Sequence, residues 1–395
     1  MTALPTFSRR TRWAVPVGAV AIAGAVTAGV LISAAASASP ELPAKTPAQL
    51  LAALASRTGP PPPLTGTVVE SAALGIPQLP ELGNQNSAVS LLAGSHTIKV
   101  WYASPTHLRL SMPVTMDETD VIRNGRQVWL WQSNKDSVTK LTLPAKPAKS
   151  AQATPAPSDV PLTPQQAASQ VLKAVGPSTR VSVQRTATVA GQPAYQLVLS
   201  PKSSASLIGR VNIAIDASNN VPLRVQVFAR GASSPAFQVG YTAISFVRPA
   251  AANFAFRPPA GAKVKTVTVP SDAGQQKRSA AAGKSSQVQV VGKDWLSVAV
   301  FPSSVLSEVT GGNAAGAAGQ MAQSAVPGGQ PSSGSGETAA IVHTLMAAAT
   351  PVHGAWGSGQ LLHTSLVSML ITHDGHVLIG AVRPAVLEHA AAQLK

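Results

Sequence analysis

The sequence predicts an α+β protein whose main part is a large antiparallel sheet of about eleven strands, curled or closed, together with two helices. A small α+β C-terminal domain is expected to follow it. Three observations lead to this fold class. Residues 94–144 read as five short alternating strands in succession, strand patterns resume between residues 181 and 246, and two amphipathic helix patterns begin at Thr46 and Thr163. Apolar residues make up 45% of the 395 residues, enough for a sizeable core.

The five strands of residues 94–144 form an up-and-down meander. Asn124-Gly125 is the strongest hairpin signal in this stretch, because both residues tolerate a positive φ. Side chains alternate with period two along a strand, so each strand has two faces. The residues that share a face within a strand are Ile98, Val100 and Tyr102; Leu108, Leu110 and Met112; and Gln127, Trp129 and Trp131, the last set lying opposite Val128 and Leu130.

The other elements of the large domain follow in chain order. A helix is expected from Thr46, with Pro47 at its first position, to about Arg57, and a first strand over residues 64–74. Residues 145–161 form a linker rich in Pro, Ala, Lys and Ser. A second helix is expected from Thr163 to about Val175, ended by Gly176-Pro177. The remaining strands are expected at residues 181–189, 195–199, 210–215, 222–229 and 237–246.

The predicted domain bounds are 45–265 for the sheet domain, 266–286 for a basic polar linker and 287–395 for the C-terminal domain. In the last of these we expect strands at 288–291 and 295–301, a helix at 337–349, and a final helix from Pro384. Residues 361–372 and 376–382 are expected to form a hairpin about Asp374-Gly375. Residues 311–336, a low-complexity run, are predicted to be a disordered insert.

Residues 1–38 read as an export signal. Arg9, Arg10 and Arg12 precede an uncharged apolar stretch, Trp13–Ile32, and small residues follow up to Ala38, as at a signal peptidase site. The stretch is also long enough to cross a bilayer, since about 20 apolar residues suffice. A cleaved signal peptide and an uncleaved membrane anchor therefore both stay open. Either alternative predicts that the rest of the chain is extracytoplasmic, secreted or held at the outer face of the cell membrane.

Charge and cysteine content limit the partners. The formal net charge is +15, which predicts attraction to polyanions. Because of the export signal, an anionic membrane surface or envelope polymer is favoured and nucleic acid is not expected; a merely soluble basic surface is the alternative. The chain has no cysteine, so disulfides and a lipidated cysteine are excluded.

Clusters that could carry catalysis or bind a metal are few. His373 and His376 flank a hairpin turn without a third ligand nearby in the sequence, so no metal is predicted. Asp117, Glu118 and Asp120 could form half of a glycosidase-like pair, but no partner carboxylate is identifiable, and solvated strand-edge charge is favoured. No nucleophile elbow, phosphate loop or dinucleotide fingerprint occurs. The sequence therefore predicts no enzyme and no cofactor.

Short motifs in both domains resemble the LolA-like periplasmic lipoprotein carriers and the related RseB (MucB)-like regulators. The likeness in the large domain covers roughly residues 45–265 and that in the small domain residues 295–384, where the family's glutamate is replaced by Ala381. The motifs that carry it are Pro105-Thr-His-Leu108-Arg109, Asn124-Gly125-Arg-Gln-Val-Trp129-Leu-Trp131, Pro222-Leu223-Arg224, Asn253-Phe-Ala-Phe256-Arg-Pro258-Pro-Ala-Gly261, Trp295-Leu-Ser-Val-Ala-Val-Phe301 and Val377-Leu-Ile-Gly380-Ala-Val-Arg-Pro384.

This resemblance implies that the large curved antiparallel sheet is an unclosed β-barrel covered by helices. It also implies a non-enzymatic carrier that binds lipid or an acylated lipoprotein between sheet and helices. The alternative is an RseB-like envelope-stress sensor that regulates a membrane-anchored anti-sigma factor through its C-terminal domain. Arg109 and Arg224 are expected at the rim near a lipid headgroup, or else as solvated strand arginines. For Trp129 and Trp131, as for Trp101, filling the core between sheet and helices is the alternative. The expected cavity residues are Val100, Tyr102, Leu108, Leu110, Trp129, Trp131, Leu197, Val225 and Val227.

Overall fold

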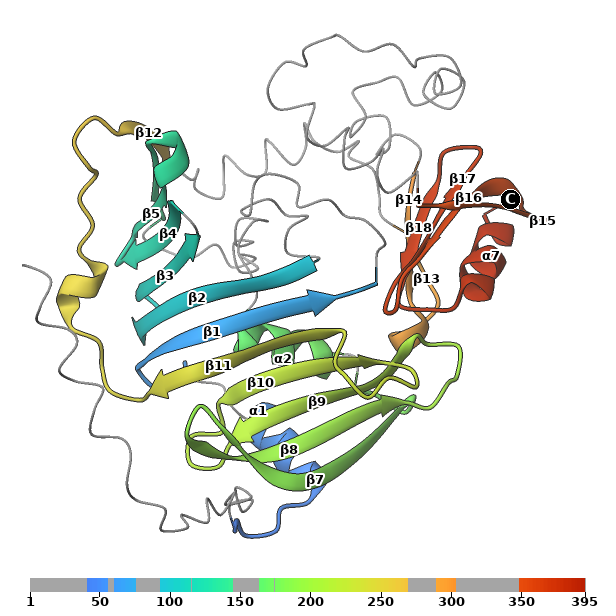
Figure 1. The fold of residues 1–395 in the computed structure, drawn as a ribbon, viewed down its shortest axis with the longest axis horizontal. Helices are drawn as coiled ribbons and strands as arrows, with labels where there is room; N and C mark the ends of the chain where they lie inside the picture. Colours follow the sequence, from blue (N-terminus) through green and yellow to red (C-terminus); the bar gives the residue numbers. More distant parts are fainter. Residues whose placement is uncertain are drawn as a thin grey trace, which may run out of the picture. The chain divides into compact units, whose positions relative to one another are not determined.

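The computed structural model of the protein describes residues 41–55, 60–75, 93–114, 116–144, 163–173, 175–268, 289–302 and 348–394. They form a large sheet, a smaller sheet and three α-helices (Figure 1). None of these helices is both long and apolar enough to cross a bilayer. The predicted leader (1–38), the predicted insert (311–336) and residues 337–347 of the predicted helix lie outside the described part of the chain.

The large sheet has twelve strands in the order β12-β6-β5-β4-β3-β2-β1-β11-β10-β9-β8-β7. Its two edge strands, β12 and β7, do not pair with each other, so the predicted unclosed sheet is confirmed. The strands are β1 (Leu64–Ala73), β2 (Ala93–Ser104), β3 (His107–Val114), β4 (Asp117–Asn124), β5 (Gln127–Gln132), β6 (Ser137–Thr142), β7 (Thr179–Val189), β8 (Gln192–Pro201), β9 (Ile208–Asp216), β10 (Pro222–Ala229), β11 (Phe237–Ser245) and β12 (Lys263–Thr268).

Strand β12 corrects the prediction of a purely antiparallel sheet. It pairs in parallel with β6, from Lys263 opposite Ser137 to Thr268 opposite Thr142, so the sheet is mixed. To pair in parallel with β6, β12 must begin at the same end of the sheet as β6. Residues 246–262 carry the chain from the end of β11 to that position through a 3₁₀ turn, η3 (Ala251–Phe254). The sequence of β12 is Lys-Val-Lys-Thr-Val-Thr, which has too few bulky apolar residues for the strand to stand out by its pattern.

Helices α1 (Pro47–Ala55) and α2 (Pro164–Lys173) begin where the sequence predicts them. Each starts with a reciprocal capping box, in which a threonine hydroxyl accepts the hydrogen bond of a backbone N–H three residues on. The Gln49 N–H donates to Thr46 Oγ1 over 3.2 Å, and the Gln166 N–H donates to Thr163 Oγ1 over 3.4 Å. In return, each glutamine side chain accepts from the threonine backbone N–H over 2.8 Å.

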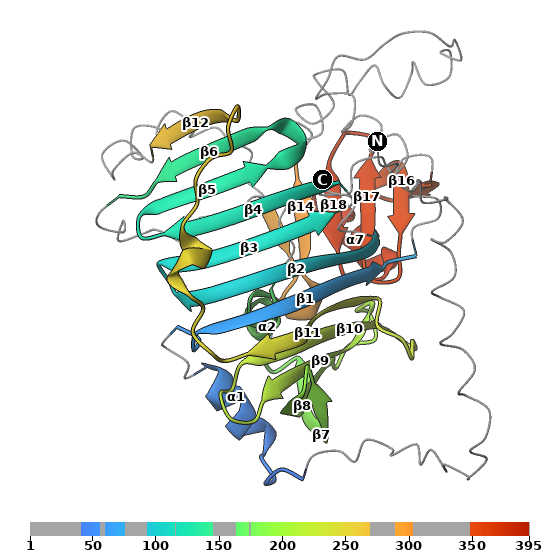
Figure 2. The same cartoon turned by 60° about the vertical axis from the view of Figure 1, so that its left-hand side comes forward.

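The main hydrophobic core lies between these helices and the large sheet (Figures 1 and 2). Leu50 of α1 and Ala168 of α2 are buried there with Leu197, Ile213 and other residues from the strands β1–β3 and β7–β11. A flat sheet would hold β7 and β3 several strand widths apart, beyond the reach of two helices. The sheet therefore curves around them, as the right-handed twist of strands favours.

The opposite side of the sheet is covered in one half by the crossing segment. The turn η3 and the residues after it lie across β3–β5 on the side away from the helices (Figure 2). Phe254 of η3 is buried, and its ring contacts His107 at 5.7 Å between centroids. The two halves of the sheet are thus covered on opposite sides.

The smaller sheet has the strand order β13-β14-β18-β17-β16-β15, with the helix α7 (Pro384–Ala392) packed against β17 and β18. Leu387 of α7 is fully buried, and this helix begins at Pro384 as predicted. The strands are β13 (Gln289–Val291), β14 (Val298–Phe301), β15 (Thr350–Gly354), β16 (Gly357–His363), β17 (Ser368–Thr372) and β18 (Val377–Gly380).

Two predictions for this smaller sheet are corrected. Residues 361–372 are not one strand, because a turn separates β16 from β17; there the Thr364 N–H and hydroxyl both bond to the Val367 carbonyl oxygen at 2.9 Å. Strand β15 was not predicted. It contains Pro351 and has no apolar alternation, and it lies at the edge of the sheet, where a missing N–H is tolerated.

The two sheets are joined by a few specific contacts. Trp295, in the short turn η4 (Asp294–Leu296), is buried in the main core, and its Nε1–H donates to Thr179 Oγ1 over 2.7 Å. Ser206 forms an isolated β-bridge with Val382, flanked by a 3.0 Å hydrogen bond from the Leu207 N–H to the Ala381 carbonyl. These bonds connect the smaller sheet to the starts of β7 and β9.

The first prediction concerns the core. We expect Ile213→Ala to lower the free energy of unfolding by about 2–5 kcal/mol, because it leaves a cavity among fully buried side chains. The matched control is Val264→Ala on β12, where the side chain is 50% exposed and a change of about 0.5 kcal/mol or less is expected. Urea denaturation followed by circular dichroism measures both. Equal effects of the two substitutions would contradict the assignment of the core.

Candidate functional site

Alternate residues of each strand point to the two sides of the large sheet. We call the side that faces α1 and α2 the inner face and the opposite side the outer face. Three of the predicted cavity residues lie on the inner face within the core: Val100, Leu197 and Val225 are 4%, 0% and 1% exposed. They pack against helix residues such as Leu50 and are part of the core between the sheet and the helices.

The apolar inner face continues beyond the helices. We call this continuation, on β3–β6, the apolar strip. Each of its side chains is partly exposed, and only the two on β3 border the core. The strip consists of Leu108 and Leu110 on β3, Val121 on β4, Val128 and Leu130 on β5, and Leu141 on β6.

The strand register makes one row of the strip continuous, whereas the second row, from Leu108 to Val128 and Leu141, is interrupted by Arg123 on β4. Val100 in the core is paired with Leu110, which is paired with Val121, and the same row continues through Leu130 and Thr139 to Lys265 on the edge strand. Five interstrand steps of about 4.8 Å separate β2 from β12, so the row crosses about 24 Å. A hydrocarbon chain laid along this row would have apolar side chains under most of its length.

The two α-helices pack on the other half of the sheet. Helix α2 packs chiefly on β10 and β11, and α1 packs on β7. Tyr102 and Val227, two further predicted cavity residues, are partly buried and lie against the main core on this inner face.

Removing a methylene group from water is worth about 0.8 kcal/mol. The partly exposed strip is therefore a surface that can stabilise a hydrocarbon ligand.

The two tryptophans predicted for the cavity lie elsewhere. Trp129 is paired with Ile122 and Trp131 with Asp120, and these positions alternate with the apolar strip, so both rings lie on the outer face. The Trp129 ring contacts Phe256 of the crossing segment at 5.6 Å between centroids, and Lys140 Nζ lies 4.9 Å from its centre. Trp129 therefore packs against the crossing segment on the outer face. Apart from Trp131, the other predicted cavity residues lie on the opposite face of the sheet.

Arg109 is not at a rim but in an ion pair on the outer face. Its Nη2 donates to Asp120 Oδ2 over 2.5 Å, and its guanidinium lies 5.4 Å from the centre of the Trp101 ring. Asp120 is 2% exposed, and burial raises the pKa of its carboxyl although the charge of Arg109 acts in the opposite direction. Ser111 donates to Glu118 beside this pair over 2.5 Å. The expectation of solvated strand-edge charge is therefore wrong for Asp120, which is buried in an ion pair.

Arg224 also lies on the outer face. Its aliphatic part crosses Gly240 of β11, where a Cβ atom would come within 2.8 Å of Arg224 Cγ. Burial lowers the pKa of this guanidinium, and its Nε has no hydrogen-bond partner among the described residues.

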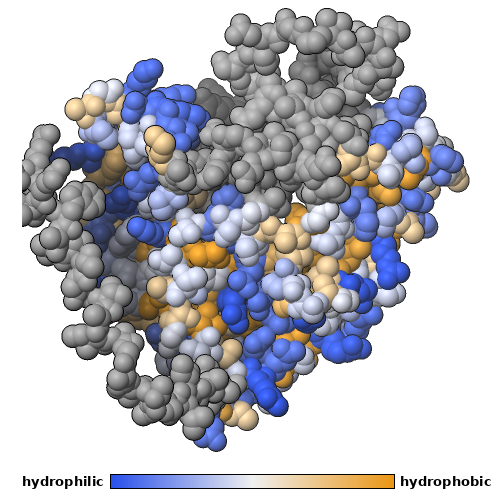
Figure 3. All heavy atoms as spheres, in the orientation of Figure 1, coloured by the Kyte–Doolittle hydropathy of each residue, from blue (hydrophilic) through white to orange (hydrophobic). Residues whose placement is uncertain are grey.

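On the face of the molecule seen in Figure 3, hydrophobic patches are broken up by hydrophilic residues.

A hollow of about 320 Å³ lies on the outer face of β1, β2 and β11. Most residues that line it alternate with the core residues of the same strands, although Val100 and Ile244 of the core also border it, so it lies mainly on the other side of the sheet from the apolar strip. Its lining includes Thr65, Thr67, Lys99, Trp101 and Ser245.

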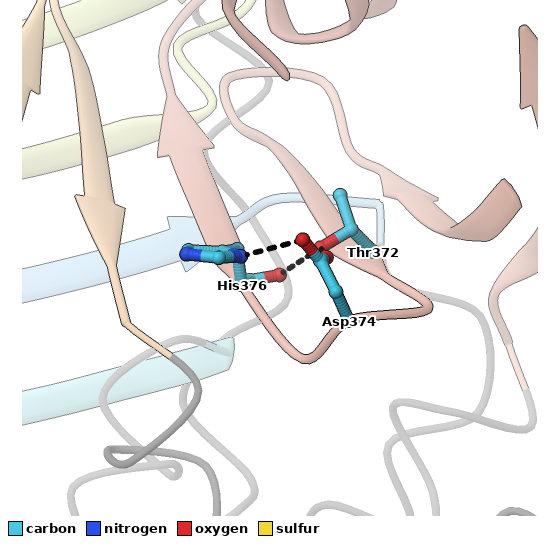
Figure 4. A network of polar contacts seen from close by, with 3 residues as sticks. All are labelled: Thr372, Asp374 and His376. Carbon is cyan, nitrogen blue, oxygen red and sulfur yellow. Dashed lines mark hydrogen bonds and ion pairs between the residues drawn. The ribbon is translucent and has the colours of Figure 1, made fainter. Parts of the chain in front are cut away.

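His376, one of the two histidines at the predicted hairpin turn, lies in a hydrogen-bonded network with Thr372 and Asp374 (Figure 4). His376 Nδ1 lies 3.0 Å from Asp374 Oδ2, and the hydroxyl of Thr372 donates to the other carboxylate oxygen. The Thr372 hydrogen bond, with His376 beside it, lowers the pKa of Asp374. No group of three potential metal ligands occurs in the described part of the chain. This turn is explained by local hydrogen bonding.

The structure therefore brings seven of the nine predicted cavity residues to the inner face and places both tryptophans and both arginines on the outer face. On β5 the inner-face residues are Val128 and Leu130, and the inner face also carries Val121 and Leu141, none of which was among the predicted residues. The alternation of Val128 and Leu130 with the tryptophans was visible in the sequence. Only the position of the helices decides which side is the inner one.

No protein-family model matches this sequence, and no curated protein matches it. Several solved structures are similar to it. The Pseudomonas aeruginosa MucA/MucB complex contains a chain with 15% identity and a TM-score of 0.39, covering 87% of this chain and 94% of that chain. A LolA-superfamily protein from Nitrosomonas europaea has 11% identity and a TM-score of 0.23, covering 54% of this chain and 99% of that chain. A putative outer membrane lipoprotein-sorting protein domain from Vibrio parahaemolyticus has 10% identity and a TM-score of 0.19, covering 50% and 90%. The predicted resemblance to MucB and LolA-superfamily proteins is thus found among solved structures.

The second prediction concerns the buried ion pair. We expect Arg109→Met to lower the free energy of unfolding by roughly 2 kcal/mol near neutral pH, less than for a fully buried pair because Arg109 is 30% exposed. The cause is the Asp120 carboxylate left buried without its partner. Its pKa is already raised and rises further without Arg109, so the loss is present above that pKa and is relieved as the pH falls through it.

Urea midpoints of the wild type and the variant, measured at about pH 7 and about pH 4.5, test this dependence. The control is the double variant Arg109→Met/Asp120→Leu, which removes both charges and should recover most of the stability at both pH values. A loss that is independent of pH would show that packing of the arginine, and not the carboxylate, is responsible.

Proposed function

We propose that this protein is an extracytoplasmic, non-enzymatic carrier that holds the acyl chain of a lipid or an acylated lipoprotein on the apolar strip. The observation that carries the proposal is that the strip extends, residue by residue, from the core at Val100 onto partly exposed strands beyond the helices. The leader predicted at residues 1–38 supports a location outside the cytoplasm.

The magnitudes favour reversible binding. Ten buried methylenes would contribute about 8 kcal/mol, and association itself costs several kcal/mol of translational, rotational and side-chain freedom. The strip already excludes part of the solvent, so the net gain is smaller still. A ligand held by such a surface can be released to a membrane or another carrier. A carrier needs this balance, in contrast to a permanently bound structural lipid.

The third prediction tests the strip directly. Leu130→Glu should weaken binding of 11-(dansylamino)undecanoic acid by about tenfold or more, since it places a charge in the middle of the apolar row. The matched control is Gln127→Glu on the same strand, which adds the same charge to an exposed side chain on the outer face. Fluorescence titration gives the two dissociation constants.

Circular dichroism and urea denaturation of both variants check that the sheet remains folded. Equal weakening by Leu130→Glu and Gln127→Glu would show that charge alone is responsible. Unchanged binding in both variants, or no binding by the wild type, would count against the carrier proposal.

A sensor that passes lipid occupancy to a partner protein is the second candidate. It is favoured by the contacts between the sheets: Trp295 of the smaller unit is buried in the same core that the apolar strip borders. Through Thr179 and the bridge at Ser206, a ligand on the inner face could change how firmly the smaller sheet is held. A membrane-anchored regulatory protein would then be the partner.

The fourth prediction separates the sensor from the simple carrier. If the protein is a sensor, saturation with the same fatty acid should change hydrogen-exchange protection of the Leu207 and Arg383 amides at least several-fold. These two N–H groups donate across the joint to Ala381 and Ala205. The Leu378 and Leu370 region inside the smaller sheet serves as the internal reference. If hydrogen-exchange protection of these two amides is unchanged when lipid is bound, the sensor proposal fails and only the carrier proposal remains.

A further inference from the structure

The open edge of the large sheet beside the apolar strip is formed by β12. This strand pairs with β6 on one side only. Because Lys265 is paired with Thr139 and Val267 with Leu141, the odd-numbered residues of β12 share the inner face with the strip. Lys263 and Lys265 are both exposed there, at the end of the rows that begin in the core.

The charge of these lysines is not compensated within the described residues. Neither lysine takes part in an ion pair there, and Asp136, which accepts a 2.7 Å hydrogen bond from the Lys263 backbone N–H, provides only its carbonyl oxygen. Arg123 is a third cation on the inner face, where its Nε donates to the Gly125 carbonyl oxygen over 3.2 Å. On β4–β6 and β12, the acid on this face is Asp117, at the start of β4.

The inner face is therefore amphipathic along its rows. One end is the helix-covered core, the middle is the apolar strip, and the far end carries two lysines with their charges in solvent. From Val121 to Lys265 there are three interstrand steps, or about 14 Å. An amphiphile whose tail lies on the strip and points toward the core would place its headgroup at β12.

We propose that β12 selects the headgroup of the ligand: the protein binds amphiphiles with an anionic headgroup, held by Lys263 and Lys265, in preference to uncharged ones. This inference rests on the proposed function, since it assumes that the tail occupies the strip. It assigns the headgroup contact to β12, on the inner face, whereas Arg109 and Arg224 lie on the outer face of the sheet.

The experiment uses one tail and one fluorophore with two headgroups: 11-(dansylamino)undecanoic acid and its methyl ester, titrated into the full-length protein. We expect the wild type to bind the acid about tenfold more tightly than the ester, with the difference decreasing as salt is added. The variant Lys263→Gln/Lys265→Gln should lose most of this preference through weaker binding of the acid, with binding of the ester unchanged.

The matched control is Lys99→Gln/Lys140→Gln. It removes the same net charge from the outer face of β2 and β6, and it should keep the preference for the acid. A preference that survives in the β12 variant, or that disappears equally in both variants, would overturn the inference. Equal binding of acid and ester by the wild type would overturn it too, while leaving the carrier proposal standing. If the wild type binds neither compound, both proposals fail.

Lysines on an edge strand can also act only to prevent edge-to-edge association of sheets. In that case the β12 variant would form dimers or larger species in size-exclusion chromatography, with no change in the ratio of the two dissociation constants. That outcome would overturn the headgroup assignment. A monodisperse variant with a lost preference would support it.

Discussion

The fold depends on a mismatch between the width of the sheet and the width of its helical cover. Twelve strands about 4.8 Å apart span about 50 Å, and two α-helices about 10 Å in diameter cover only about 20 Å of that width. Curvature of the sheet brings β7 and the strands next to β1 into one core, but it cannot bring β4–β6 under the same helices. Apolar inner-face residues such as Leu130 are therefore left partly exposed.

The crossing segment, residues 246–262, covers the outer face in the half of the sheet that lies beyond α1 and α2 (Figure 2). On the outer face of this half, Phe254 packs against His107 of β3 and Phe256 packs against Trp129 of β5. Burial of that face stabilises β3–β6, and none of the helices that the structure describes packs on the inner face of these strands.

Much of the fold could be predicted from local patterns. Alternation identified the five strands of the meander, and Thr46 and Thr163 marked the helix starts because their capping chemistry is local. Pairing at a distance was not visible: β12 has no strong pattern and is held beside β6 by the crossing segment. The faces of the predicted site residues were not visible for the same reason. Alternation separates Val128 from Trp129, but which of them faces the helices depends on the whole sheet.

The distribution of charge agrees with this division of the sheet into faces. On the outer face, Asp120 is enclosed, and a cation must accompany it because a buried carboxylate without a partner is costly. On the inner face at β12, the cations are exposed and remain solvated without any acidic partner, so they cost little to maintain. A buried pair with its charge neutralised contributes to a fixed structure, whereas exposed cations at the end of an apolar row remain available to an incoming anion. The outer layer of the sheet is thus fixed by a neutralised pair, and the carrier proposal assigns the accepting and releasing of an amphiphile to the inner face alone.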